Sequence, residues 1–164
     1  MAYEDQLPHI KRRVEFLLNE ALEKSPRDQA ITFVMRVISN YVSVGIDAGS
    51  YSIKQKNLMV SRLAYEELLV SPTFKGWAEN TVNEHPLPLK HTWDWLCNDC
   101  DKLTPIDVWH HFESNPMITV LKKEDNLLNE AGLRSSSKPD RYKHVGIEII
   151  KLKKMPYESW KEIH

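Results

Sequence analysis

The feature that most constrains the fold is a segment near the start of the chain that is apolar on almost every side. At helical spacing between residues 26 and 44, apolar side chains leave little polar surface: Ala30, Ile31, Phe33, Val34, Val37, Ile38, Tyr41 and Val42. A helix that is apolar around most of its circumference must be covered by other elements. The segment is therefore predicted to be a central helix, covered by its own chain or by a second copy in a homodimer.

Amphipathic helices are predicted on both sides of this segment. Residues 6–24 carry one apolar stripe at intervals of three and four, formed by Leu7, Ile10, Val14, Leu17 and Ala21. Residues 53–70 repeat the spacing with Leu58, Met59, Leu63 and Leu69. Between the first two helices, Ser25 is the expected N-cap and Pro26 the expected first helical residue.

Beyond residue 72, prolines divide the chain into shorter elements. Short helices are expected near 73–82, 87–100 and 104–114, the last capped by Thr104 with Pro105 following it. Residues 117–121 and 145–152 are expected as strands that pair antiparallel. Between them, a helix over 122–131 should end at Gly132, with Leu133 folding back on Leu128.

These patterns predict one domain, 1–164, of the mainly α (α+β) class. Residues 1–71 would form an N-terminal three-helix layer. Residues 72–164 would carry short helices, a small two-stranded antiparallel sheet and the candidate site. The N-terminus has no apolar signal region and no apolar run approaches a membrane span. We therefore expect a cytoplasmic protein without a membrane partner.

The charge is balanced overall but not along the chain. The net charge is −1, which gives no global attraction to nucleic acid. Residues 122–164, however, hold ten Lys and Arg against seven Asp and Glu. This basic end is either a solvated surface or a surface that faces phosphate.

Two motifs have ordinary structural explanations that we favour. Cys97 and Cys100 form half of a zinc site, which His91 or the adjacent pair His110 and His111 would have to complete. Adjacent side chains on a helix diverge by ~100°, so zinc is not expected and two ordinary buried thiols are. Trp93, Trp95 and Trp109 could stack on bases beside Lys90, but core packing is the favoured interpretation.

Polar residues suited to a site are concentrated between residues 83 and 148. His85 follows Glu84 and precedes Pro-Leu-Pro-Leu, a stiff backbone that can orient an imidazole. An imidazole can take a proton from water, and the adjacent carboxylate can orient it or bind a cation. A surface histidine in a proline-rich turn is the plain alternative.

The loop over residues 134–144 is the best candidate for binding a partner. Arg134 and Arg141 carry planar guanidinium groups suited to phosphate or carboxylate, and Lys138 and Lys143 add charge. The basic strand end over residues 151–154 could extend the surface. A solvated connecting loop is the alternative.

The order Glu84-His85-x-x-Pro-Leu, followed by Glu124-Asp125-Asn126-Leu-Leu-Asn129, resembles HNH (ββα-metal) nucleases. The resemblance covers His85 to about Asn129 and implies that His85 is the general base and that Asn126 or Asn129 stands in the helix. It also implies that Asp125, His110 or His111 holds a divalent metal, magnesium or manganese. A second resemblance, over residues 84–148, is to uncharacterised bacterial and mobile-element proteins and implies no activity.

Two functions remain open. The first is a metal-dependent, nuclease-like phosphodiester hydrolase acting on nucleic acid. His85, Glu84 and Asn126 would be catalytic, Asp125 and His111 would bind metal, and the substrate-binding residues would be Arg134, Arg141, Lys138 and Lys143. The second is a non-catalytic phage- or plasmid-borne protein that binds or inhibits a host or defence protein.

Overall fold

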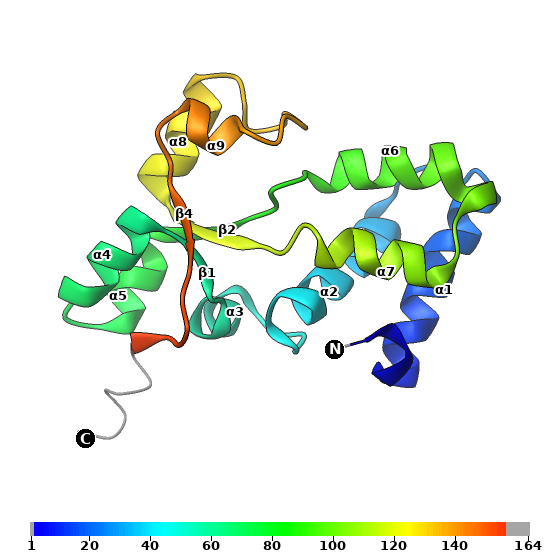
Figure 1. Cartoon of the computed structure of the whole chain (residues 1–164), viewed down its shortest axis with the longest axis horizontal. Coiled ribbons are helices and arrows are strands. Elements are labelled where there is room, and N and C mark those ends of the chain that lie inside the picture. The colour runs from blue at the N-terminus through cyan, green and yellow to red at the C-terminus, as the bar shows by residue number, and fades with distance from the viewer. Residues whose placement is uncertain (1, 157–164) are drawn as a thin grey trace.

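The structure, a computed structural model, describes residues 2–156. They form two parts that lie side by side (Figure 1). One part is a layer of helices, on the right of the figure, and the other is a small mixed sheet with helices on both faces. The segments that join the two parts position the candidate site.

The helical layer encloses one apolar core. It consists of α1 (Pro8–Leu22), α2 (Gln29–Val44), α6 (Leu89–Asp99) and α7 (Pro105–Glu113), with the short 3-10 helices η1 (Tyr3–Asp5) and η2 (Cys100–Lys102). Helix α2 packs against α1 and α7, so its own chain covers most of it. The tryptophans Trp93 and Trp109 fill this core, as the favoured interpretation expected.

The sheet has four strands in the order β2-β3-β1-β4. They are β1 (Met59–Ser61), β2 (Thr81–Glu84), β3 (Ile118–Leu121) and β4 (Ile149–Lys151). Strand β3 is parallel to β1 and antiparallel to β2, while β4 is antiparallel to β1. The helices around the sheet are α3 (Ser50–Lys56), α4 (Arg62–Val70), α5 (Phe74–Glu79), α8 (Lys122–Glu130) and α9 (Arg141–His144).

Each face of the sheet has its own apolar cluster. Leu121 of β3 packs with Leu68 of α4 and Trp77 of α5. Its neighbour Val120 points the opposite way, as alternation along a strand requires, and packs with Leu128 of α8 and Tyr142 of α9. The sheet is thus covered by α4 and α5 on one face and by α8 and α9 on the other (Figure 1).

Several predicted elements are confirmed. The mainly helical class, the first helix and strand 118–121 are present. Thr104 caps α7 with Pro105 as its first residue. Gly132 adopts φ 67° after α8, and the N–H of Leu133 donates to the carbonyl of Leu128 at 2.8 Å. This is the predicted Schellman ending.

The predicted two-stranded sheet is wrong. Residues 118–121 and 149–151 do not pair with each other, because β1 lies between them. Strand β1 comes from the middle of the segment predicted as one helix, 53–70. The buried side chain of Asn57 ends α3 there and donates to the carbonyl of Met117 and to Oγ1 of Thr119, at 3.0 and 3.1 Å. These bonds hold residues 59–61 against β3.

Two smaller differences concern element boundaries. Helix α2 starts at Gln29 instead of Pro26, because Asp28 is the N-cap and accepts the N–H of Ile31 at 2.8 Å. The boundary between the two parts does not lie at residue 71, where it was predicted. Helices α6 and α7, from the second half of the chain, complete the helical layer, and β1, from the first half, belongs to the sheet. No helix within residues 2–156 combines the length and hydropathy that a membrane crossing requires.

Candidate functional site

A cleft of about 730 Å³ lies between the two parts of the molecule. Helix α2 forms one wall, and the end of β2 with the segment leading into α6 forms another. The third wall is the end of α8 with the loop after it. Its lining residues are Arg27, Thr32, Arg36, Asn83, Glu84, His85, Pro88, Leu89, Lys90, Asn129, Arg134 and Ser135. The structure therefore brings the predicted residues Glu84, His85 and Arg134 into one cleft.

Four exposed cations line this cleft: Arg27, Arg36, Lys90 and Arg134. They come from three separate stretches of the chain, so only the tertiary structure brings them together. Glu84 is the one carboxylate among the lining residues. The cleft is therefore strongly basic although the whole chain is close to neutral.

Sequence reasoning missed Arg27 and Arg36. One signal was available, because Arg36 is the only charged residue in the sixteen-residue helix α2. A single charge on a helix that is otherwise apolar marks the side that must face solvent or a ligand. Thr32 lies one turn before Arg36 and lines the same cleft.

His85 sits at the inner end of the cleft. Its Nδ1 lies 3.3 Å from Oγ of Ser39 on α2, which fixes the ring across the two parts of the molecule. Burial, with the positive charges of Arg36 and Arg141 acting in the same direction, lowers the pKa of His85 to about 4. The imidazole is therefore neutral at pH 7, and one ring nitrogen keeps a lone pair.

Arg141 is the structural centre of the site. Only 1% of its side chain is exposed. Its guanidinium donates to carboxylate Oε2 of Glu84 at 2.8 Å, to Oη of Tyr142 at 3.1 Å, and to the carbonyls of His85, Pro86, Leu133 and Arg134. All five N–H donors of an arginine are thereby used within the protein. Arg141 holds the walls of the cleft together, and it has no donor left for the substrate contact expected from the sequence.

Glu84 is bound on the inner side of the cleft. Its Oε2 accepts from Arg141 and, at 2.9 Å, from Oη of Tyr142. Burial raises the pKa of Glu84, while the charge of Arg141 opposes that rise. Burial and the adjacent Glu84 carboxylate also raise the pKa of Tyr142. Glu84 is therefore an anchor for Arg141 rather than a free carboxylate.

Asp125 and Arg134 form the other ion pair at this site. Oδ2 of Asp125 lies 3.2 Å from Nη2 of Arg134, and 57% of the Arg134 side chain is exposed. The second oxygen of Asp125, Oδ1, is buried, and no group within residues 2–156 donates a hydrogen bond to it. Asp125 therefore holds one side of the guanidinium of Arg134, a residue that also lines the cleft.

The structure does not bring the predicted metal ligands together. His111 of α7 stacks on Trp95 of α6, with 3.9 Å between the ring centroids, and its Nε2 lies 3.3 Å from Oγ1 of Thr92. Asp125 pairs instead with Arg134. Within residues 2–156, no group of three or more His, Cys, Asp or Glu side chains is placed to hold a metal ion. The residues named for magnesium or manganese therefore do not fit a shared ion.

The remaining predicted residues are dispersed. Asn126 is exposed on α8, and Lys138 is exposed on the loop before α9. Cys97 and Cys100 are both free thiols packed against the helical core. Both are half-buried, whereas the favoured interpretation expected two buried thiols.

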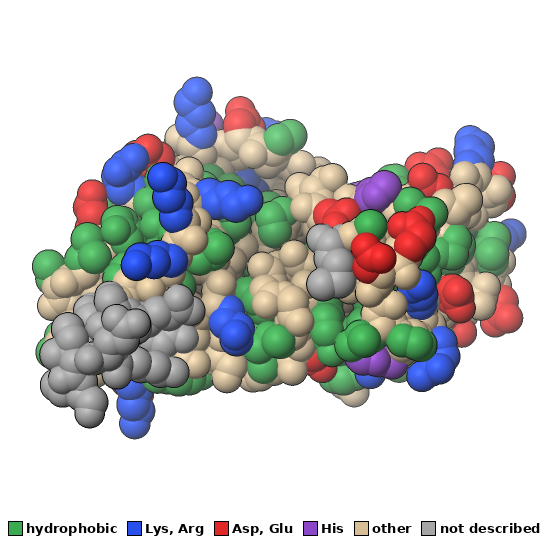
Figure 2. Space-filling view, turned by 60° about the horizontal axis from the view of Figure 1, so that its bottom comes forward, with side chains coloured by type: hydrophobic (Ala, Val, Ile, Leu, Met, Phe, Trp, Pro, Cys, Tyr) green, Lys and Arg blue, Asp and Glu red, His purple; other side chains and the backbone are tan. Residues whose placement is uncertain are grey.

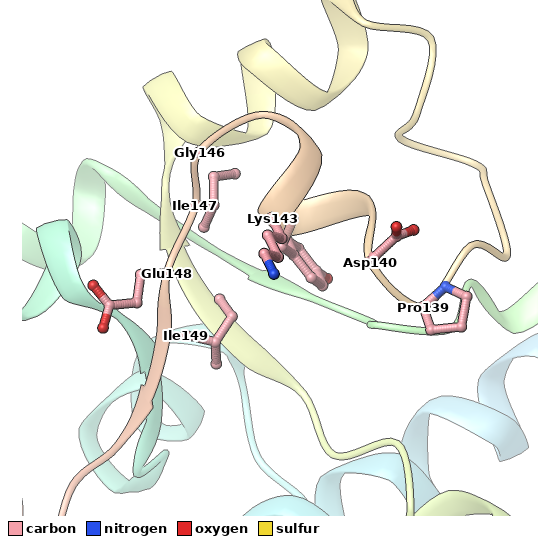
Figure 3. A pocket seen from close by; sticks show the side chains of 8 residues that line it. Pro139, Asp140, Lys143, Gly146, Ile147, Glu148 and Ile149 are labelled. Carbon is pink, nitrogen blue, oxygen red and sulfur yellow. The ribbon is translucent and has the colours of Figure 1, made fainter.

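Lys143 belongs to a different hollow, between α9 and the edge strand β4. This groove of about 560 Å³ is lined by Pro139, Asp140, Tyr142, Lys143, Gly146, Ile147, Glu148 and Ile149. Figure 3 shows Ile147 and Ile149 along one side and the Lys143 side chain beside them. Lys143 thus lies apart from His85 and the basic cleft.

The charges of the two parts differ. On the face shown in Figure 2, Lys and Arg side chains gather over the sheet, while most Asp and Glu side chains lie over the helical layer. The sheet part carries the basic C-terminal stretch of the described chain. A polyanion would therefore be attracted to the sheet and to the cleft beside it.

No protein-family model, curated protein or solved structure matches this chain. The function must therefore be inferred from the site itself.

Proposed function

We propose that this protein binds the phosphate backbone of a nucleic acid in the cleft between its two parts. The observation that carries the proposal is the convergence of Arg27, Arg36, Lys90 and Arg134 on one hollow. Its only lining carboxylate, Glu84, already has Arg141 as its partner. Asp125 pairs with Arg134, so Arg27, Arg36 and Lys90 remain as the excess positive charge of the cleft.

Phosphate fits this arrangement better than a single carboxylate does. A guanidinium group presents paired donors that match the oxygens of phosphate, and Arg27, Arg36 and Arg134 offer three of them. These side chains are exposed, so contact with a ligand requires little desolvation. A nucleic acid would gain further free energy by releasing condensed counterions as each phosphate is neutralised.

Within this proposal, His85 is the residue suited to hydrolytic chemistry. A phosphodiester hydrolase needs a group that accepts a proton from water and cations that stabilise the charge growing on phosphate. His85 is neutral and borders the arginines, so it can serve the first need, although its low pKa makes it a weak base. The arginines would serve the second. Glu84 would act indirectly, by holding Arg141 and through it the backbone of His85.

Binding is tested by fluorescence anisotropy with a labelled single-stranded oligothymidylate at several salt concentrations. Arg36→Gln and Arg134→Gln should each weaken binding roughly tenfold and lower the slope of log K against log salt by about 0.7, the value for one phosphate contact. Lys102→Gln is the matched control, because Lys102 is exposed in η2 and lies outside the cleft. Equal affinity for all four proteins would exclude the cleft as the binding site.

Hydrolysis is tested on supercoiled plasmid with magnesium, with manganese and with a chelator. Cleavage that is lost in His85→Ala while oligonucleotide binding persists would assign His85 to the chemistry. Binding without cleavage under all three conditions would leave a nucleic-acid-binding protein and would reject the hydrolase. Cleavage only with added metal would support the resemblance to HNH nucleases.

A second candidate function, binding of a protein partner, is favoured by the free edge of β4. This strand pairs only with β1 in the described sheet. The backbone at Glu148 and Leu152 bonds toward Arg62 and Leu58, so the groups of Ile149 and Lys151 point outward. Such an edge can accept an added strand. With Lys143, Lys151 and the groove of Figure 3 beside it, an extended acidic peptide is the partner we propose.

This candidate is tested with a synthetic peptide that alternates valine and glutamate. Binding should shift the amide resonances of residues 149 and 151, and Lys151→Pro should abolish it by removing an outward N–H without disturbing the pairing with β1. Lys151→Gln should weaken binding less. Binding that survives the proline substitution would reject strand addition.

A further inference from the structure

A second basic hollow lies at the other end of β2. Its volume is about 570 Å³, and three lysines from three elements line it: Lys54 of α3, Lys75 of α5 and Lys122 of α8. The other lining residues are Ser50, Tyr51, Ala78, Glu79 and Thr81. The hollow therefore carries three positive charges and one negative charge.

Lys54 is a buried cation without an opposite charge. Only 8% of the residue is exposed, and its Nζ donates to the carbonyls of Ala78 and Thr81 at 2.7 and 2.8 Å. An ammonium group has three donors, so one is left. Within the described chain no carboxylate pairs with it, and the charge that acts on it is that of Lys122. Since a buried lysine usually has a charged partner, Lys54 is suited to bind an anion that enters the hollow.

Lys122 is also placed where its charge is not favoured by its own helix. It is the first residue of α8, and the dipole of a helix opposes positive charge in the first turn. Its neighbour Lys123 is compensated by Glu67, with Nζ and Oε1 2.6 Å apart. Lys122 has no such partner among the ion pairs of the described residues. An anion in the second hollow would supply one.

Strand β2 connects this hollow to the basic cleft. Thr81 lines the hollow, whereas Asn83 and His85 line the cleft. Residues 81, 83 and 85 recur at the strand period, so they lie on one side of the segment and span about 13 Å. The amide nitrogen of Asn83 lies 3.5 Å from Oγ of Ser50, which lines the hollow. The two sites are therefore adjacent along a single strand.

Helix α8 begins beside the start of β2, and its other end reaches the cleft. The N–H of Lys122 donates to the carbonyl of Asn80, just before β2, at 2.8 Å. Asn129, near the other end of α8, lines the cleft. Lys122, Asn126 and Asn129 are exposed and spaced by four and three residues, so they share one helical face about 10 Å long. Asn126 thus lies between the hollow and the cleft.

We propose that this face of α8 and the edge of β2 form one track for a single-stranded nucleic acid, which rests on the proposed function of the cleft. One phosphate would bind the arginines of the cleft, and another would bind Lys54, Lys75 and Lys122. The amide groups of Asn126 and Asn129 can donate to and accept from unpaired bases between them. In a duplex the bases are already paired and stacked, so these amides could not reach their hydrogen-bonding edges.

The test measures the affinities of a labelled dinucleotide, tetranucleotide and octanucleotide of thymidylate, and of a duplex of the same length as the octanucleotide. Affinity should rise from the dinucleotide to the octanucleotide and be lower for the duplex. The double variant Lys75→Gln with Lys122→Gln should weaken octanucleotide binding at least tenfold and leave dinucleotide binding unchanged. It should also lower the salt slope by about 0.7, the value for one single-strand phosphate contact.

Two further variants sharpen the comparison, and both alter exposed side chains rather than the buried Lys54. Lys123→Gln removes the same charge from the next residue, outside the track, and should leave octanucleotide affinity unchanged. Glu79→Gln removes the only acid of the hollow and should raise octanucleotide affinity. A loss of stability would lower the affinity of both variants, so an unchanged affinity for Lys123→Gln and a raised affinity for Glu79→Gln would show an effect of charge.

The failures of the two proposals are distinguishable. If Arg36→Gln weakens every ligand while the lysine double variant weakens none, the cleft stands and the track is rejected. If neither variant matters, both are rejected. If the duplex binds more tightly than the octanucleotide, the track does not select single strands and the inference is overturned.

Discussion

Replacing Arg141 with methionine should lower the free energy of unfolding by about 3–5 kcal/mol, the range for breaking one side of a buried ion pair. The pair qualifies as buried, since 1% of the Arg141 side chain and 12% of the Glu84 side chain are exposed. Methionine fills part of the same space, so the loss would come mainly from charge and hydrogen bonds. Four backbone carbonyls, including those of His85 and Leu133, would lose their donor.

The pH dependence of the stability of Arg141→Met shows whether the lost ion pair with Glu84 causes the deficit. Burial already raises the pKa of Glu84, and loss of Arg141 removes the charge that opposes the rise. A carboxyl whose pKa is higher in the folded state stabilises the fold at low pH, and this stability is lost as the pH rises through the folded pKa. The deficit of Arg141→Met relative to the wild type should therefore shrink on acidification. Adding Glu84→Gln should recover roughly 1–3 kcal/mol.

Urea unfolding followed by the fluorescence of the buried tryptophans measures these values. Arg134→Met is the matched control, because its ion pair with Asp125 is largely exposed on the arginine side and should contribute less than about 1 kcal/mol to stability. A loss below about 1 kcal/mol for Arg141→Met, or no recovery with Glu84→Gln, would refute the structural role given to this arginine.

Three further predictions concern single residues. His85 has its pKa lowered to about 4, so the stability it contributes is present above pH 6.5 and lost as the pH falls toward 4; proton NMR should show a neutral ring at pH 5, and His85→Gln should flatten the acid side of the stability profile by up to ~3 kcal/mol. Gly132→Ala should cost about 1 kcal/mol in urea unfolding, from the φ of 67° alone, because nothing lies within 4 Å of the added methyl group; no loss would contradict the helix ending. Asn57→Ala should cost about 2–3 kcal/mol, since the carbonyl of Met117 and the N–H of Met59 lose their buried partner; a loss below about 0.5 kcal/mol would show that water replaces the amide.

The helices that the sequence predicted well are those whose apolar period and end signals agree. Helices α1, α7 and α8 have an apolar face together with a first-turn proline, a Thr104 cap or a Gly132 ending. Such signals act between residues a few positions apart. They can therefore be read without knowing what the helix packs against.

The short strands could not be read in the same way. Strands β1 and β2 have three and four residues, too few for a period to show. Residues 59–61 continue the helical spacing of their neighbours, and only the amide of Asn57, bonded to β3 from a distant part of the chain, places them in the sheet. Tertiary hydrogen bonds here override local preference.

The candidate site, too, was only partly predictable from the sequence. The position of His85 on a stiff, proline-rich segment and the basic character of residues 134–141 were evident in the sequence. The place of Arg27 and Arg36 in the cleft and the burial of Arg141 were not, because charge type says nothing about which side chains a fold encloses. Arg134 and Arg141 are the same residue seven positions apart, yet one is 57% exposed and the other 1%.

The sequence by itself determined the helical class, the ends of α1, α7 and α8, and the supply of cations and imidazole, because these depend on composition and on contacts between near neighbours. The tertiary structure alone decided the strand order, which cations face solvent and which are enclosed, and the meeting of α2, β2 and α8 around one basic cleft. Burial and long-range pairing depend on the whole chain at once, and no local pattern encodes them.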